Sequence, residues 1–148
     1  MNRELISLLH LVATSAMFGI IWLVQLVHYP TFLYVDVLKT TSFEVFHQNA
    51  ITPIVLPLML LELTTFGLLF KQGERDRGFL CSGIILAILW LSTFLIQTPI
   101  HQELEFGFNP DTITKLILTN WIRTLGWSIR MILILRLRIK HFSSYPTC

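Results

Sequence analysis

The chain has 148 residues, of which 53% are hydrophobic and 14% are charged, and its formal net charge is +2. A soluble domain usually carries about a quarter charged residues. Here no Asp, Glu, Lys or Arg occurs from Leu5 to Val35 or from Gly78 to Gln102, and each run is longer than the roughly 20 apolar residues that cross a bilayer as a helix. These properties exclude a water-soluble enzyme, a nucleic-acid-binding domain and a disordered tail.

The first predicted membrane span covers residues 5–29 and stops before Pro30, because the residue that precedes a proline disfavours helix. Its apolar run is far longer than the h-region of a signal peptide and no A-x-A cleavage site follows, so we interpret it as a retained membrane helix. Apolar residues continue over 32–46. They predict a helix that lies on the membrane surface between the first two spans.

Three further spans follow in the sequence. Residues 51–70 form the second, which Pro57 is predicted to kink, and a short polar turn of seven residues, KQGERDR, leads to the third over 78–98. Asn109 and Pro110 predict the start of the fourth, over 111–137, as a capping side chain and a proline at the first helical position. The predicted fold is therefore a single all-α domain, a transmembrane four-helix bundle over residues 1–148.

The basic residues predict the orientation of this bundle. With the N-terminus inside, two residues, Lys39 and Lys115, fall on the outer side, and seven fall on the inner side: Arg3, Lys71, Arg75, Arg77, Arg136, Arg138 and Lys140. Cytoplasmic segments carry the excess of Lys and Arg. Both termini are thus expected in the cytoplasm, and in a bacterial inner membrane the two longer connections face the periplasm.

Polar residues inside the spans indicate a site in the outer half of the bundle. Glu62 and Arg123 fall at compatible depths by the rise of 1.5 Å per residue, and each needs a partner or a cavity. Asn120 lies three residues before Arg123 and shares its helix face. Two interpretations stay open: a structural ion pair with Asn120 bonding across helices, or a catalytic group in which Glu62 and Arg123 form a charged floor and Asn120 orients a ligand.

Four histidines are candidate cofactor ligands. His28, His47 and His101 are predicted near the outer end of the spans, where with Glu62 they would bind copper, iron or zinc; the alternative is a set of hydrogen-bonded interfacial side chains. Glu44 and His47 form one E-x-x-H pair, which we interpret first as a local surface pair. His10 lies in the inner third of the first span, as a hydrogen-bonding group between helices or as a haem ligand or proton relay.

The first span resembles that of small four-helix membrane proteins related to HemJ-type protoporphyrinogen oxidase and the copper-resistance CopD group. The resemblance is carried by Leu9-His10-Leu11 at its start and by His28-Tyr29-Pro30 at its end. Because haem binding is known for HemJ, it implies a haem b whose ligand here would be His10.

The last span resembles a second family, the anthrone-oxygenase-like four-helix membrane proteins. The segment Asn120-Trp121-Ile122-Arg123-Thr124 is similar to the Asn-x-x-Arg-Thr ending of that family. The family is associated with oxidation of aromatic polyketides, so this resemblance implies redox chemistry on a small hydrophobic molecule.

The leading functional hypothesis is a small membrane oxidoreductase, similar to an oxygenase, with a polar and metal-binding pocket that faces outward. Buried titratable groups around a cavity are where chemistry tends to occur. The main alternative is a non-catalytic subunit of a larger membrane complex that binds a lipid, another small ligand or a pigment. A homo-oligomer fits either hypothesis. A transporter is less favoured, because four helices without a repeat leave a monomer little room for alternating access.

Overall fold

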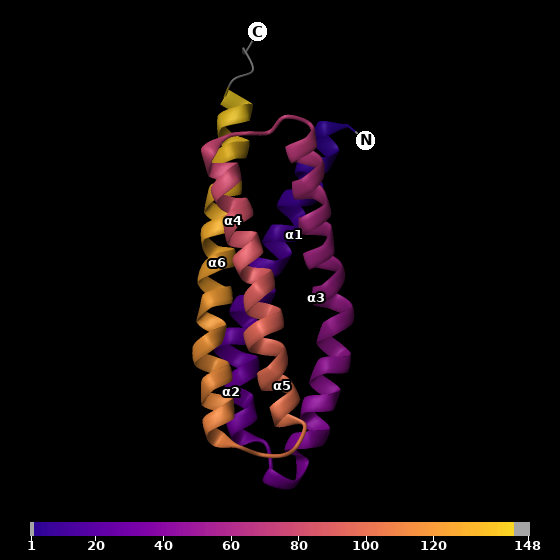
Figure 1. Ribbon diagram of the computed structural model, residues 1–148, viewed down its shortest axis with the longest axis vertical. Coiled ribbons are helices and arrows are strands. Elements are labelled where there is room, and N and C mark those ends of the chain that lie inside the picture. Colours follow the sequence, from indigo (N-terminus) through magenta and orange to yellow (C-terminus); the bar gives the residue numbers. More distant parts are fainter. Residues whose placement is uncertain (1, 144–148) are drawn as a thin grey trace.

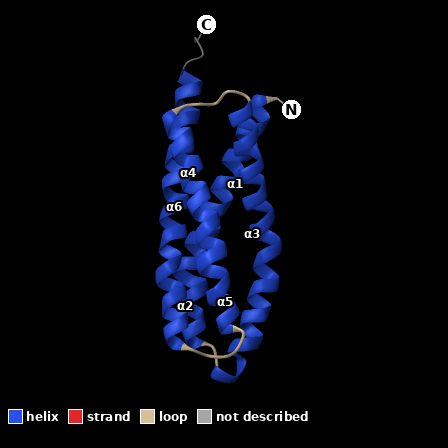
Figure 2. Cartoon of the chain, in the orientation of Figure 1, coloured by secondary structure: helices blue, strands red, loops and turns tan. Residues whose placement is uncertain are grey.

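The computed structural model describes residues 2–143. Those residues are helical apart from short connections, and no strand occurs among them (Figure 2). The prediction of an all-helical chain is confirmed.

Three long apolar helical stretches form most of the structure. The first consists of α1 (Arg3–Leu23), the π-helical turn η1 (Val24–His28), α2 (Tyr29–Thr31) and the 3-10 turn η2 (Phe32–Tyr34). The second is η3 (Val37–Lys39) with α3 (Thr40–Lys71), and the third is α4 (Arg77–Ser92), the π-helical turn η4 (Thr93–Gln97) and α5 (Thr98–Leu104). Each is long and apolar enough to cross a membrane. The more polar α6 (Pro110–Ser143) follows them.

Two predicted helix ends are wrong, because helix continues past both Pro30 and Pro99. A π-helical turn precedes each proline: the N–H of Tyr29 donates to the carbonyl of Val24, and the N–H of Thr98 donates to that of Thr93. The wider turn accommodates the proline ring, which would clash with the carbonyl four residues earlier in a regular α-helix. The first and third stretches therefore extend to Tyr34 and Leu104.

The predicted surface helix over 32–46 is also wrong. Only short 3-10 turns occupy its first part, and residues from Thr40 onward belong to α3, which continues without interruption through Pro53 and Pro57. Thr40, Glu44 and His47 are buried at spacings of four and three residues, as on one face of a continuous helix. The start of α6 is as predicted, since the side-chain oxygen of Asn109 accepts hydrogen bonds from the N–H groups of Asp111 and Thr112 at 3.0 and 3.3 Å.

The helices run lengthwise and alternate in direction (Figure 1). α1 packs against both α3 and α6, and α6 packs against α4. The α3–α4 connection lies at the same end as the start of α1 and the end of α6: Arg3 pairs with Glu74 at 2.6 Å and Lys140 with Asp76 at 2.8 Å. Its hydrogen bond to Asp76 raises the pKa of Lys140. The third stretch reaches α3 mainly through α5, at the opposite end.

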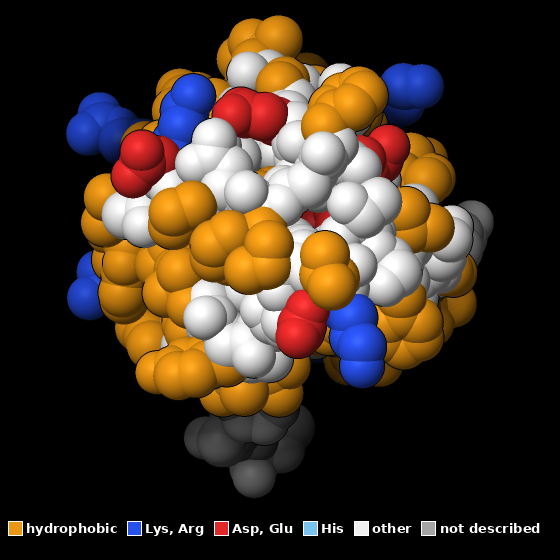
Figure 3. All heavy atoms as spheres, turned by 90° about the horizontal axis from the view of Figure 1, so that it is seen from below, with side chains coloured by type: hydrophobic (Ala, Val, Ile, Leu, Met, Phe, Trp, Pro, Cys, Tyr) orange, Lys and Arg blue, Asp and Glu red, His pale blue; other side chains and the backbone are white. Residues whose placement is uncertain are grey.

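Polar and apolar side chains are distributed as in a membrane protein. Large aliphatic side chains are exposed around the bundle, such as Leu23, Ile84, Leu95 and Leu118, each more than half exposed. Glu44, Glu62, Asn120 and Arg130 are fully buried. The end face near α2 and α5 mixes apolar, acidic and basic side chains (Figure 3). This inside-out distribution buries the costly groups among partners and leaves apolar surface for lipid.

The packing of α4 on α6 depends on Gly126. A Cβ atom added there would lie 2.6 Å from Cδ2 and 3.2 Å from Cγ of the fully buried Leu89. We expect Gly126→Ala to lower the free energy of unfolding by about 1 to 3 kcal/mol, because Leu89 has no room to move. Denaturant titration of the micelle-solubilised protein measures this. Gly19, where an added Cβ meets nothing within 4 Å, is the matched control, and an equal loss in Gly19→Ala would contradict the packing argument.

Candidate functional site: a histidine cluster beside a cavity

Three histidines from separate helices meet at the end of the bundle near α2 and α5. Nε2 of His28, on η1, lies 2.6 Å from Nδ1 of His47, on α3. The ring centroids of His47 and His101, on α5, are 5.1 Å apart with an interplanar angle of 32°. We refer to His28, His47 and His101 as the histidine cluster. The convergence expected from topology is present in the structure.

A buried carboxylate supports this cluster. Oε1 of Glu44 lies 2.8 Å from Nδ1 of His101 and accepts a hydrogen bond from Nε2 of Gln48 at 2.9 Å. The same Gln48 nitrogen lies 2.7 Å from Oε1 of Glu105, which follows α5. Glu44 is therefore not the surface group that its sequence position suggested. Glu44 joins α3 to α5 through His101, and Gln48 links Glu44 to Glu105.

Arg123 of α6 lies in the same region, and the side chains around it are neutral. Nη1 of Arg123 donates to Oδ1 of Asn120 at 3.3 Å, and its guanidinium lies 5.5 Å from the ring centroid of Trp127. The hydroxyl of Tyr29 lies 3.0 Å from Nε2 of His101, and Tyr29 also lies close enough to Arg123 to interact with its charge. Asn120 is held in turn by Gln25, which accepts its amide proton at 2.9 Å. Asn120 and Arg123 share a face as predicted.

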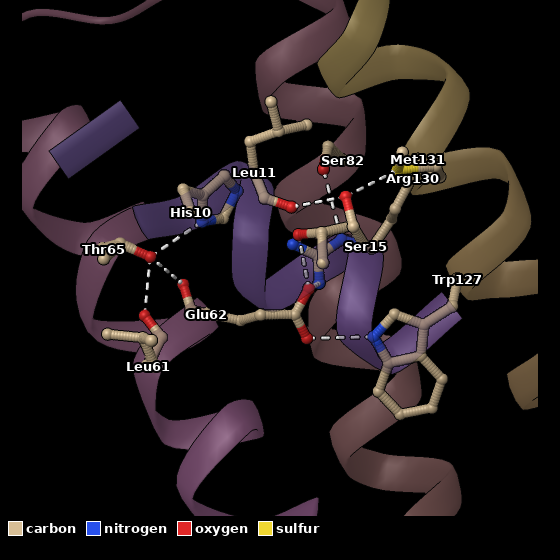
Figure 4. A network of polar contacts seen from close by, with 11 residues as sticks. His10, Leu11, Ser15, Leu61, Glu62, Thr65, Ser82, Trp127, Arg130 and Met131 are labelled. Atoms are coloured by element: carbon tan, nitrogen blue, oxygen red, sulfur yellow. Dashed lines mark hydrogen bonds and ion pairs between the residues drawn. The ribbon is translucent and has the colours of Figure 1, made fainter. Parts of the chain in front are cut away.

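The predicted pairing of Glu62 with Arg123 is wrong, because Glu62 pairs with Arg130 instead. Nη1 of Arg130 lies 3.3 Å from Oε1 of Glu62, and both side chains are fully buried. Figure 4 shows the surrounding contacts: the indole N–H of Trp127 donates to Oε2 of Glu62 at 2.9 Å, and Nε of Arg130 donates to Ser82 at 3.3 Å. Thr14 donates to Oε1 of Glu62 at 2.7 Å. We refer to Glu62, Arg130, Thr14 and Trp127 as the ion-pair cluster.

The sequence contains a signal that distinguishes Arg130 from Arg123. They are seven residues apart on α6 and so lie on one face two turns apart. Counting from the outer end matched Glu62 to Arg123. The end of the bundle that is rich in basic residues is the better reference: Glu62 lies nine residues before Lys71, where α3 ends, and Arg130 lies ten residues before Lys140, whereas Arg123 lies seventeen before it.

His10 lies beside the ion-pair cluster and away from the histidine cluster. Its Nδ1 is 2.8 Å from the hydroxyl of Thr65, which donates its own proton to the carbonyl of Leu61 (Figure 4). Nδ1 of His10 therefore carries the hydrogen of this contact. His10 does not line the cavity described below, so its placement supports a hydrogen-bonding role between α1 and α3 and gives no support to haem ligation.

The residues predicted to bind a metal do not form a ligand set. A ring nitrogen of His28 is hydrogen-bonded to a ring nitrogen of His47, and Glu62 belongs to the ion-pair cluster. Within residues 2–143, no group of three or more His, Cys, Asp or Glu side chains has the arrangement of a metal site. We therefore assign no chemical step to a metal.

A cavity of about 270 Å³ lies next to the histidine cluster, between α3 and the stretch from α4 to α5. Its lining is mostly apolar and includes Met17, Ile21, Val55, Met59 and Phe94. Trp90 also lines it, and the polar lining residues are Tyr29, His47, Gln48, Thr52, Thr93, Gln97, Thr98, His101 and Arg123. Leu56 and Phe94, which also line it, are 42% and 56% exposed. The cavity therefore reaches the exposed apolar surface of the bundle.

Three residues of this lining each hold one buried side-chain atom without a hydrogen-bond partner among the described residues. These atoms are Nε of Arg123, Nε1 of Trp90 and Oε1 of Gln97. The orientation of the Gln97 amide is set by its other end, which donates to Thr119 at 3.1 Å, while the Thr119 hydroxyl donates to the carbonyl of Lys115. Most buried polar groups are paired. Two of these atoms are donors and one is an acceptor, and all three belong to residues that line one cavity.

Comparison with protein-family models, curated proteins and solved structures gave no match for this chain. The two family resemblances carried by His10, by residues 28–30 and by residues 120–124 stay predictions.

Proposed function

We propose that the protein spans the membrane four times, with α6 as the fourth helix and both termini in the cytoplasm. Arg123 and Arg130 make α6 less apolar, but both side chains are buried within the bundle, and exposed positions such as Leu118 and Leu125 are aliphatic. The end that holds Arg3, Arg75 and Lys140 is the cytoplasmic end by the distribution of positive charge. The histidine cluster then lies at the outer end.

We further propose that the cavity binds a small amphiphilic molecule taken from the membrane. The observation that carries this proposal is a mostly apolar cavity with several polar residues in its lining, among them Gln97 and Arg123. Binding pockets typically combine an apolar wall with a few convergent polar groups. The polar head of a bound molecule would lie among the polar residues of this lining.

The cavity shape supports entry from the lipid phase. Gln48 bridges Glu44 and Glu105 at the outer end, where water would enter. The lining reaches lipid between Leu56 of α3 and Phe94 of η4. A molecule that enters there places its tail among the apolar side chains and its head toward the histidine cluster. The sequence also led to the hypothesis that the protein oxidises such a molecule, and this stays a prediction. A role as a non-catalytic, ligand-binding subunit of a larger complex stays a prediction as well.

Photolabelling tests the binding site. A long-chain alcohol with a diazirine on its chain, placed in nanodiscs with the protein, should label cavity-lining residues such as Met17 and Met59, located by mass spectrometry of peptides. Val55→Trp fills the cavity and should abolish this labelling. Leu118→Trp, at a lipid-facing position 64% exposed, should leave it unchanged. Labelling spread evenly over the lipid-facing surface in all three proteins would overturn the proposal.

A further inference from the structure

Arg123 is a buried charged group without an ion-pair partner among the described residues. Arg130 is paired with Glu62, and Glu44 lies within hydrogen-bond distance of His101. Arg123 is only 7% exposed, yet it forms no ion pair with any residue of the described chain. A buried and uncompensated charge is strongly unfavourable. Its position on the cavity wall suggests where a compensating charge belongs.

The neighbours of Arg123 hold the guanidinium without neutralising it. Asn120 and Tyr29 offer neutral oxygen atoms, and the face of Trp127 offers a weak attraction for a cation. Gln25 fixes Asn120 by accepting its amide proton at 2.9 Å. Nε of Arg123 is left without a partner. The guanidinium is therefore held in place on a residue that lines the cavity, and none of these contacts neutralises its charge.

We infer that Arg123 selects ligands with an acidic head, so that the cavity binds the anion of a membrane-soluble acid. This inference rests on the proposed function and adds the chemical class of the ligand. Guanidinium groups match carboxylate and phosphate oxygens with charge-assisted hydrogen bonds. In a cavity of about 270 Å³, at the small end of ligand pockets, the ligand is a single-chain or single-ring acid rather than a two-chain phospholipid.

A matched pair of probes tests this inference. The long-chain diazirine alcohol is compared with the carboxylic acid of the same chain, at equal mole fraction in nanodiscs and at a pH well above the pKa of the acid. The acid should label the cavity-lining residues with an apparent affinity about ten- to a hundredfold higher than the alcohol, as expected for a charge-assisted contact in a buried site. Equal affinities would overturn the inference and leave the proposed function intact. Labelling of the cavity by neither probe would overturn both.

Variants of Arg123 test whether its positive charge causes the preference for the acid over the alcohol. Arg123→Gln should bring the acid and the alcohol to equal affinity, and Arg123→Lys should restore part of the preference because it keeps the positive charge. Lys115→Gln removes an exposed charge from the same helix and should leave the preference unchanged. A preference that persists in Arg123→Gln would overturn the assignment. If Arg123→Gln fails to fold, the comparison of the two probes on the unaltered protein still decides the inference.

Discussion

Replacement of Glu62 by Gln is expected to lower the free energy of unfolding by about 3 to 5 kcal/mol. The substitution keeps the shape of the side chain but leaves the fully buried guanidinium of Arg130 without its anionic partner. Removing one partner of a buried ion pair leaves an uncompensated charge, which costs more than the pair itself contributes. Unfolding in mixed micelles of increasing denaturing detergent, followed by circular dichroism, measures the change.

Two controls separate the charge effect from a general loss of packing. The double variant Glu62→Leu with Arg130→Leu removes both charges and should recover most of the lost stability, because an apolar pair replaces a buried ionic one at little cost. Asp111→Asn removes an exposed carboxylate at the start of α6 and should change stability by only about 0.5 kcal/mol. A double variant no more stable than Glu62→Gln would show that the ion pair is not what stabilises this region.

The Trp127→Ala variant is expected to lose about 3 to 5 kcal/mol of stability. Trp127 is fully buried among Met17, Ile21, Met59 and Leu89, so truncation leaves a large void between α1, α3, α4 and α6. It also removes the N–H donor of Glu62. Trp127→Phe retains most of the volume and should lose about 1 to 3 kcal/mol, the cost of one unsatisfied buried carboxylate oxygen.

The same unfolding measurement on half-buried Trp121 provides the comparison for Trp127. Trp121 meets Trp22 edge-on at a centroid distance of 5.8 Å and is only partly enclosed, so Trp121→Ala should lose less than Trp127→Ala. If the two alanine variants lost equal stability, the central position assigned to Trp127 would be wrong.

The sequence was sufficient to predict the helical class, the apolar stretches and the start of α6. Long apolar runs and a capping asparagine are local signals, and they do not depend on what lies across the bundle. The helix ends predicted before Pro30 and Pro99 were wrong because a proline ends a regular α-helix but not one that widens by a π-helical turn. Composition alone does not reveal whether a π-helical turn forms before Pro30 or Pro99.

The candidate site was predictable as a set of residues but not as a set of pairs. Depth counting placed His28, His47 and His101 near one end of the bundle, and the structure brings them together. It did not distinguish Arg123 from Arg130, because both lie on one face of α6. The part played by Glu44 was missed, since α3 was expected to begin at residue 51 and Glu44 therefore to lie on the surface. Partner choice depends on helix rotation, which a single sequence does not specify.

The two π-helical turns have a consequence for any helical-wheel description of this chain. Each inserts one extra residue into a helix, and one residue corresponds to about 100° of rotation. The side chain of Tyr29, directly after η1, therefore faces the interior through a phase change that a regular helix of the same sequence would not make. A designer who transplants residues 3–34 as an ideal helix would rotate Tyr29 about 100° away from the centre of the buried face, so the irregular turns should be copied as faithfully as the residues themselves.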